Sequence, residues 1–110
     1  MKFLQYADAA NSICTLVLPA SFGFENRSEF LDILSHSDDT LKTWILDMRD
    51  VKRMDSSGLG LLLTLKEHAD AREQSIVLRY PNENIRNTLH RSRFDSLFSV
   101  ELEPDIRQRS

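Results

Sequence analysis

The sequence predicts a single α/β domain built on a mixed, mainly parallel sheet of about five strands, with helices packed on the sheet. Three features of the chain support this prediction. Two β-rich segments open it, helix-like and strand-like segments then alternate, and residues 43–48 form an apolar run without alternation. Such a run is typical of a central strand buried on both faces, and the opening pair is expected to form an antiparallel edge.

The length of 110 residues fits one domain, so residues 1–110 are expected to form a single unit. Residues 103–110 are polar and are expected to be a frayed tail. A domain of this size buries roughly 60–70% of the surface of its unfolded chain, which suffices without disulfides or a structural metal. The single cysteine, Cys14, is expected to be a small buried side chain.

The first two strands are expected in residues 3–6 and 12–18, as a hairpin. A helix is expected to follow, because Asn26 and Glu29 have the spacing of a capping pair. Apolar side chains then recur at helical spacing, and this helix is expected to end within residues 35–39.

The strongest predicted helix covers residues 57–71 and follows a polar loop over residues 49–55. Its leucines exceed one buried stripe. Leu59 and Leu63 are therefore expected nearer the surface, as overflow of the core or as part of a docking patch, and for Leu63 we favour the core. The side chains expected to face the sheet are Leu61, Leu62, Leu65 and Ala69.

The last part of the chain predicts a strand over residues 75–80, a helix over residues 82–92 and a short strand over residues 97–102. Ile85 and Leu89 are expected to point inward from that helix. The complete order is β-β-α-β-α-β-α-β, in which helices join parallel strands.

The charge balance argues against nucleic acid or an anionic membrane as the dominant partner. The net charge is −3, from 14 basic and 17 acidic side chains. Residues 1–50 carry four Lys or Arg against eight Asp or Glu, a balance of −4, and residues 51–110 carry ten against nine, a balance of +1. A basic cluster, Arg86, His90, Arg91 and Arg93, lacks interleaved aromatic residues apart from Phe94.

Neither a signal peptide nor an apolar run of the ~18 residues that a membrane span needs is evident, so a cytoplasmic protein is expected. Signatures of metal sites and enzymes are also missing. His36, His68 and His90 do not share the spacing of helical metal ligands. Ser56 and Ser57 lack the preceding glycine of a nucleophile elbow, and no phosphate-binding loop is complete. We expect no catalytic residue and no cofactor.

The segment that stands out joins the predicted polar loop to the leucine-rich helix. In an open α/β sheet, helix N-termini at the carboxyl ends of the strands form the usual functional edge, where backbone N–H groups favour an anion. A phosphate on Ser56 would lie there beside Asp55. The alternative, which residue physics alone favours, is that Asp55 or Ser56 caps the helix and the glycines relieve crowding. The segment reads Met54-Asp55-Ser56-Ser57-Gly58-Leu59-Gly60.

This motif and the strand before it resemble the signature of the STAS-domain anti-sigma factor antagonists, or anti-anti-sigma factors. The resemblance covers most of the chain and includes the order of elements. It implies a single STAS-like domain in which Ser56, directly after the aspartate, is the phosphorylation site. It also implies a partner-binding loop formed by Asp55, Ser57, Gly58, Leu59 and Gly60, in which Ser57 supports the loop. Outside the motif, the matching residues are 45–51 and Pro81, Ile85, Leu89, Phe94, Leu97 and Phe98.

The resemblance implies partner switching. The unmodified protein would bind an anti-sigma factor or a histidine-kinase-like serine kinase, phosphorylation of Ser56 would end that binding, and a metal-dependent serine phosphatase would restore it. The chain would then be a substrate and not an enzyme. Lys52 and Arg53 could steer an acidic partner or offset the charge of the phosphate, although a solvated loop explains them as well. Glu25, in the loop before the first helix, is a third candidate supporting residue.

Two departures from the family pattern stand beside the resemblance. Residues 19–25 replace the Gly-x-x-Asp pattern of many members and are similar to the Phe-rich turn of a proteobacterial subgroup. The chain also stops soon after its last strand, so the terminal helix of the family is expected to be absent or shortened. The alternative function is that of a constitutive STAS subunit in a larger assembly, such as a lipid-transport ATPase complex.

Overall fold

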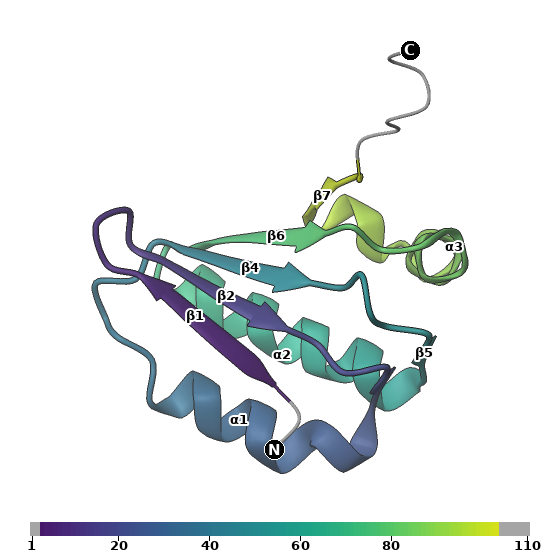
Figure 1. Ribbon diagram of the computed structural model, residues 1–110, viewed down its shortest axis with the longest axis horizontal. Helices are drawn as coiled ribbons and strands as arrows, with labels where there is room; N and C mark the ends of the chain where they lie inside the picture. The colour runs from purple at the N-terminus through teal and green to yellow at the C-terminus, as the bar shows by residue number, and fades with distance from the viewer. Residues whose placement is uncertain (1–2, 104–110) are drawn as a thin grey trace.

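The computed structural model describes residues 3–103 as one α/β domain, in which a sheet lies over a layer of helices (Figure 1). This confirms the predicted fold class. Short 3₁₀ helices at Phe24–Asn26 and Phe94–Ser96 accompany the main elements. In chain order these are β1 (Leu4–Asp8), β2 (Ile13–Val17), β3 (Ser21–Phe22), α1 (Arg27–Ser35), β4 (Thr43–Asp47), β5 (Arg53–Met54), α2 (Ser56–Ala71), β6 (Ser75–Arg79), α3 (Glu83–Arg91) and β7 (Ser99–Glu101).

The main sheet has the strand order β1-β2-β4-β6-β7. β1 and β2 pair antiparallel, and each of the other neighbouring pairs is parallel, as predicted. β4 is the central strand, and its residues Trp44, Ile45 and Leu46 are all buried. The missing alternation in this segment therefore reflects a strand that lies between two parallel neighbours.

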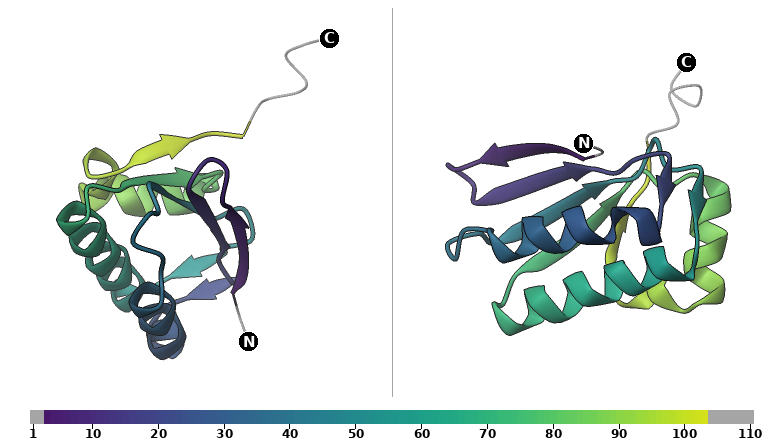
Figure 2. Two further views of the ribbon diagram at one scale, coloured as in Figure 1. Left: turned by 90° about the vertical axis from the view of Figure 1, so that its left-hand side faces the viewer. Right: turned by 90° about the horizontal axis from the view of Figure 1, so that it is seen from below.

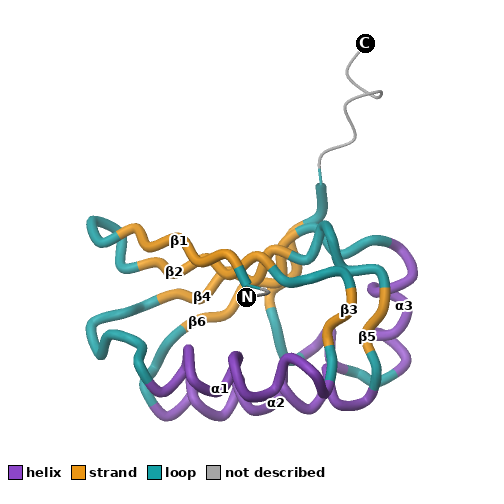
Figure 3. Tube along the Cα trace, turned by 60° about the horizontal axis from the view of Figure 1, so that its bottom comes forward, coloured by secondary structure: helices purple, strands orange, loops and turns teal. Residues whose placement is uncertain are grey.

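The helices cover one face of the sheet. α1 and α2 lie side by side on that face, and α3 lies beyond the carboxyl ends of β4 and β6 (Figures 1 and 2). In the described chain, the opposite face of the sheet carries no helix (Figure 3). Burying a leucine side chain contributes roughly 1.5–3 kcal/mol, so the inward leucines of α2 are the main force that holds this helix against the sheet.

The predicted inward face of α2 is confirmed, because Leu61, Leu62, Leu65 and Ala69 are all buried. Leu59 is half-buried and packs against the core. The expectation that Leu63 belongs to the core is wrong, since its side chain is 41% exposed. Leu63 lies on the side of α2 that points away from the sheet. We call this side the outer ridge of α2; it consists of the exposed residues Ser56, Gly60, Leu63 and Glu67.

The ends of several elements differ from the prediction. β1 runs to Asp8, whose carboxylate accepts hydrogen bonds from Asn11 in the following turn. Phe3 precedes the strand and is buried in the core. β6 ends before Tyr80, whose φ of 60° is incompatible with a continuing strand. α2 begins at Ser56, one residue earlier than predicted.

The loop predicted over residues 49–55 contains a short strand. β5 pairs in parallel with β3, with Ser21 opposite Arg53. Just before this pair, the N–H groups of Lys52 and Arg53 both donate to the carbonyl of Ala20, at 2.7 and 3.0 Å. A pairing of two-residue strands leaves no periodicity in the sequence, which explains why pattern analysis missed it.

Cys14 is buried together with Leu16 and Leu18, as predicted, and this burial raises the pKa of its thiol. The tail expected over residues 103–110 lies outside the described residues from position 104 onward, so the expectation of an absent or shortened terminal helix stays a prediction. In residues 3–103, every helix falls short of the length and apolar character that crossing a membrane requires.

A buried polar contact links the central strand to the turn between α2 and β6. Trp44 donates a hydrogen bond from Nε1 to Oε1 of Gln74 at 2.8 Å, and Gln74 donates from Nε2 to the carbonyl of Leu41. His68 packs edge-on against the Trp44 ring, with the ring centroids 6.1 Å apart. Burial of His68 lowers the pKa of its imidazole, and the nearby charge of Arg72 lowers it further.

Acid is expected to destabilise the domain through His68. The folded state holds the imidazole neutral, so the unfolded state binds the proton first as the pH falls below the ordinary pKa of 6.5. The contribution of His68 to the free energy of unfolding is therefore fully present above that pH, and it is lost as the pH falls below it. His68→Gln should flatten this decline in urea unfolding measured from about pH 7.5 to about pH 5. An unchanged pH dependence in the variant would contradict the assignment.

Candidate functional site

The candidate site is the N-terminus of α2, close to the carboxyl edge of the sheet (Figure 1). Asp55 is the N-cap residue of this helix. Its Oδ1 accepts a hydrogen bond from the N–H of Gly58 at 2.9 Å, and its carbonyl accepts one from the N–H of Leu59 at 3.1 Å. The capping interpretation is therefore confirmed for Asp55. Ser56 has no part in the cap and is the exposed first residue of the helix.

Gly23 lies directly against the carboxylate of Asp55. A Cβ atom at Gly23 would stand 2.5 Å from Oδ1 and 2.6 Å from Oδ2 of Asp55, so a side chain there would displace the cap. The N–H of Gly23 donates to Oδ1 of Asn26 at 2.8 Å. Asn26 occupies the N-cap position of α1, so the predicted start of this helix is confirmed. Its side chain, however, is buried and bonded to the turn, and makes no cap bond to α1.

The two glycines of the motif have different roles. A Cβ atom at Gly58 would lie 2.4 Å from the carbonyl oxygen of Phe22, so this glycine lets α2 approach β3. At Gly60, nothing lies within 4 Å of an added Cβ. A glycine in a helix interior costs roughly 0.5–1 kcal/mol relative to alanine. Packing within the described chain therefore explains Gly58 but not Gly60, which leaves the outer ridge of α2 flat next to Ser56.

The other two motif residues lie inward of this ridge. Ser57 is half-buried, and Leu59 is half-buried and packed against the core. Both thus belong more to the support of the loop than to its outer surface. Ser56 and Gly60 are the motif positions, besides the capping Asp55, that the structure leaves exposed.

Two exposed apolar side chains flank the motif. Neither was assigned to the site from the sequence. Phe24 is 72% exposed and directly follows Gly23, whose backbone touches Asp55. Leu63 lies farther along the outer ridge of α2. The available signal for Phe24 was its place between a glycine and an acidic residue in a short turn, where a core residue is not expected.

The loop that leads into the site is also bonded to the start of α3. Asn82 donates from Nδ2 to the carbonyl of Val51 at 2.9 Å, and its Oδ1 accepts a hydrogen bond from Ile85 at the start of α3. With β3 on one side and Asn82 on the other, residues 51–54 are fixed in place. The backbone that presents Ser56 is therefore well supported.

Lys52, Arg53 and Glu25 are exposed and lie on the segments that flank the motif. Within residues 3–103, no hydrogen bond or ion pair joins their side chains to Asp55 or Ser56. The structure thus brings Gly23 and Phe22 against the motif, but not these three charged side chains. Their supporting role stays a prediction.

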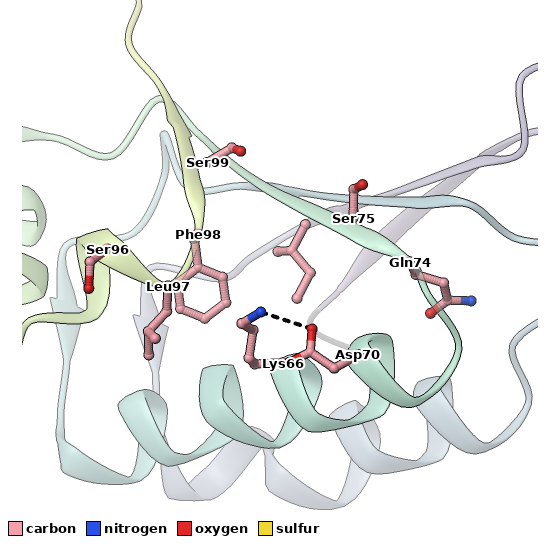
Figure 4. Close-up of a pocket in the computed structure, with 9 residues that line it drawn as sticks. Lys66, Asp70, Gln74, Ser75, Ser96, Leu97, Phe98 and Ser99 are labelled. Atoms are coloured by element: carbon pink, nitrogen blue, oxygen red, sulfur yellow. Dashed lines mark hydrogen bonds and ion pairs between the residues drawn. The ribbon is translucent and has the colours of Figure 1, made fainter.

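A pocket of about 380 Å³ lies away from this site, between the C-terminal half of α2 and the segment that leads into β7 (Figure 4). Lys66 and Asp70 line it and neutralise one another in an ion pair of 2.8 Å. Gln74, on another wall, is bonded to Trp44. In the described chain no buried polar side-chain atom lacks a partner, so this pocket offers no unsatisfied group that would select a ligand.

The basic cluster, which lies on α3 and directly after it, is partly engaged in local contacts. Arg86 donates to the carbonyl of Pro81 at 3.0 Å, and Nδ1 of His90 lies 2.9 Å from a carboxylate oxygen of Asp95. Among residues 3–103, no group of three or more His, Cys, Asp or Glu side chains is arranged to hold a metal ion. The N-terminus of α2 accordingly stays the leading candidate site.

Sequence comparison decides the family. A family profile described as "Mlab, STAS domain" matches residues 7–102. The chain belongs to the STAS-domain family. A relative of this STAS chain, the STAS-domain containing protein PA14_20770 of Pseudomonas aeruginosa (strain UCBPP-PA14), is 30% identical over 86 residues, which cover 78% of this chain and 85% of the relative. A relative from this organism agrees with the predicted proteobacterial subgroup.

Solved structures show the same fold. A candidate anti-sigma factor antagonist from Thermotoga maritima has a TM-score of 0.76 and 18% identity, covering 97% of this chain and 90% of that chain. The Bacillus anti-sigma factor antagonist SpoIIAA is similar in its unphosphorylated form, with a TM-score of 0.66, 15% identity and coverage of 97% and 93%. Its phosphorylated form has a TM-score of 0.65, 18% identity and coverage of 97% of each chain. At such identities the likeness concerns the fold alone.

The different roles of the two motif glycines can be tested by stability measurements. Gly58→Ala should lower the free energy of unfolding by about 1–3 kcal/mol, because its methyl group meets the Phe22 carbonyl. Gly60→Ala, the matched control two residues along the same helix, should raise it by about 0.5–1 kcal/mol. Urea unfolding of both variants gives the two values. Equal effects at the two positions would contradict the packing described for α2.

Proposed function

We propose that this STAS chain is a phosphorylation-controlled partner-switching regulator of the anti-sigma factor antagonist type. Its unmodified form binds an anti-sigma factor or a histidine-kinase-like serine kinase, and phosphorylation of Ser56 ends that binding. A metal-dependent serine phosphatase restores the unmodified form. The chain acts in the cytoplasm as a ligand and a substrate, and catalysis belongs to its partners.

The observation that carries this proposal is the position of Ser56. It is exposed, it is the first residue of α2, and the capping role falls to its neighbour Asp55. Its hydroxyl is therefore accessible to a kinase, and its modification leaves the cap of the helix intact. The N–H groups of the first turn and the helix dipole favour a phosphate at this end.

The modification is a transfer of the terminal phosphoryl group of ATP to Ser56. The bond between that phosphorus and ADP breaks, a bond to Oγ of Ser56 forms, and the hydroxyl proton leaves through the base of the kinase. In the reverse direction, water attacks the phosphoserine and releases inorganic phosphate. Each cycle adds or removes about −1.5 to −2 charges beside the carboxylate of Asp55.

The surface around Ser56 suits a protein partner. Phe24 and Leu63 offer exposed apolar area, and Gly60 leaves the helix surface flat between Ser56 and Leu63. A partner that covers this surface would bury the Ser56 hydroxyl, which is tolerated, but would have to bury a phosphate dianion next to Asp55. Desolvation and like-charge repulsion oppose that burial. A loss of about 3 kcal/mol would weaken binding roughly a hundredfold.

The test compares binding and modification of matched variants. The partner kinase is first isolated on unmodified protein, and its dissociation constant is then measured for the wild type, Ser56→Ala and Ser56→Glu. We expect Ser56→Ala to bind like the wild type. Ser56→Glu places a negative charge at the same position and should bind at least about tenfold more weakly. This loss is smaller than the loss expected for phosphate, because a carboxylate carries less charge. Ser28→Glu, an exposed position on α1 that receives the same charge, should bind like the wild type.

Two further readouts separate a switch from a merely structural role. Incubation with the kinase and ATP should add one phosphate to the wild type and none to Ser56→Ala, measured by mass spectrometry. Gly60→Ala should weaken partner binding although it stabilises the fold. No phosphorylation of Ser56, together with equal affinities of Ser56→Ala and Ser56→Glu, would contradict the switch. That result would favour the alternative, a constitutive STAS subunit of a larger assembly.

A further inference from the structure

β1 forms one edge of the main sheet and is exposed to an unusual degree. Each of its five residues, Leu4–Asp8, is exposed. β2, its neighbour, alternates between buried and half-buried positions. In residues 3–103, β2 is the one strand that pairs with β1, so the outer backbone groups of β1 have no strand partner (Figures 1 and 3).

Both faces of β1 contribute to this exposure. The register with β2 places Leu4 and Tyr6 on the sheet face without helices, and their side chains are 56% and 58% exposed. Gln5 and Ala7 point toward the helix side, where a groove of about 290 Å³ separates the hairpin from residues 36–41. Within residues 3–103, the helix layer therefore does not extend under β1 itself, and this strand is held by its pairing with β2 and by the buried Phe3 that precedes it.

The opposite edge of the sheet is protected by features that β1 lacks. β7 has only the three residues Ser99–Glu101, and Glu101 is engaged in an ion pair with Arg79 at 2.6 Å. Short length and charge are common devices that prevent an edge strand from pairing with another chain. β1 has five residues, no lysine and no proline, and its one charged side chain is Asp8, at the end.

We propose that β1 pairs antiparallel with β1 of a second copy of this chain, about a two-fold axis at Tyr6. The backbone of an edge strand is complementary to itself under such an axis. With the axis perpendicular to the sheet, residues on the same face lie opposite one another. The ten-stranded sheet formed in this way would keep all helices on one side.

The ends of β1 select the register. Phe3 is buried in the core and Ala9 belongs to the turn, so the free edge is limited to residues 4–8. Of the registers that keep faces matched, the one centred on Tyr6 is the one that pairs all five residues. It places Tyr6 opposite its own copy and each Asp8 opposite Leu4 of the other chain. The two carboxylates are thereby kept apart, and no like charges face one another.

The side chains of the open face support this register. Tyr6 is the first member of a row that crosses the sheet through Thr15, Ile45 and Val77, as the pairing of neighbouring strands shows. A tyrosine pair at the axis would join the two rows into one, and cross-strand aromatic pairs contribute roughly 0.2–1 kcal/mol. One short edge buries less than the ~1,200 Å² of a standard interface, so a reversible dimer at micromolar concentrations or above is expected.

Cross-linking through engineered cysteines tests the register directly. In a Cys14→Ala background, Tyr6→Cys should form an intermolecular disulfide under mild oxidation, because paired Cα atoms lie about 4.5–5.5 Å apart. Leu4→Cys alone should not, since its two copies would be about 14 Å apart. A mixture of Leu4→Cys and Asp8→Cys should cross-link. Absence of the Tyr6→Cys product, or equal yields from Tyr6→Cys and Leu4→Cys, would overturn the proposal.

Analytical ultracentrifugation tests the dimer without cross-links. The wild type should show a mass that rises from monomer toward dimer between about 10 µM and about 1 mM, and Tyr6→Lys should remain monomeric. Leu102→Lys is the matched control. It places the same charge on an exposed apolar residue outside β1, and the 56% exposure of Leu102 is close to the exposure of Tyr6 and equal to that of Leu4. If Tyr6→Lys proves unfolded by circular dichroism, Leu4→Lys replaces it. A wild type that stays monomeric, or a dimer that these edge variants leave intact, would overturn the proposal.

This inference does not depend on the proposed function, because neither β1 nor its register involves Ser56. If the chain binds no kinase and dimerises through β1, the proposed function fails and the dimer stands. If it binds a kinase through the outer ridge of α2 and remains monomeric, the dimer fails and the proposed function stands.

Discussion

The contact between the Asp55 carboxylate, the N–H of Gly58 and the backbone of Gly23 is the constraint on which the site depends. One side chain caps the main helix and also sets the distance to the turn before α1. The close approach of Gly58 to the Phe22 carbonyl fixes the same two segments from the other side. Four residues near one point thus tie β3, β5 and two helices together, and they leave Ser56 at the surface.

This arrangement separates structure from regulation within a motif of a few residues. Asp55, Gly58 and Leu59 are engaged by the fold, through a cap, a close backbone approach and the core. Ser56 and Gly60 are not required by any packing in the described chain. A residue that the fold does not need can change its charge without unfolding the domain. That separation is what a reversible modification at a helix N-terminus requires.

Prediction from sequence was most successful where a pattern repeats over many residues. The leucines of α2 and the apolar run of β4 are long enough patterns to define their buried faces, and the parallel pairing with an antiparallel edge followed from the order of elements along the chain. It failed where a single tertiary contact decides. Asn26 has the spacing of a helix cap but bonds to Gly23, and Leu63 looks like core but lies on the outer ridge of α2. The short pair of β3 and β5 has no periodicity at all.

At the site, the motif located Asp55 and Ser56, and resemblance supplied the chemistry expected of them. The sequence alone could not separate the two glycines, because the neighbour that demands Gly58 is the carbonyl of Phe22, more than thirty residues earlier in the chain. Gly23 and Phe24 were missed as site residues for the same reason. The proximity of Gly23 to Asp55, which also sets the place of the following Phe24, arises when β3 and β5 pair.

The central claim is that phosphorylation of Ser56 changes the surface of the domain and leaves its fold unchanged. Amide chemical shifts of the unmodified and the phosphorylated protein test this most directly. The shift changes should be confined to residues 22–25 and 55–60, with the amides of β4 and β6 unaffected. Changes that spread through the central strands, or a loss of spectral dispersion, would contradict it.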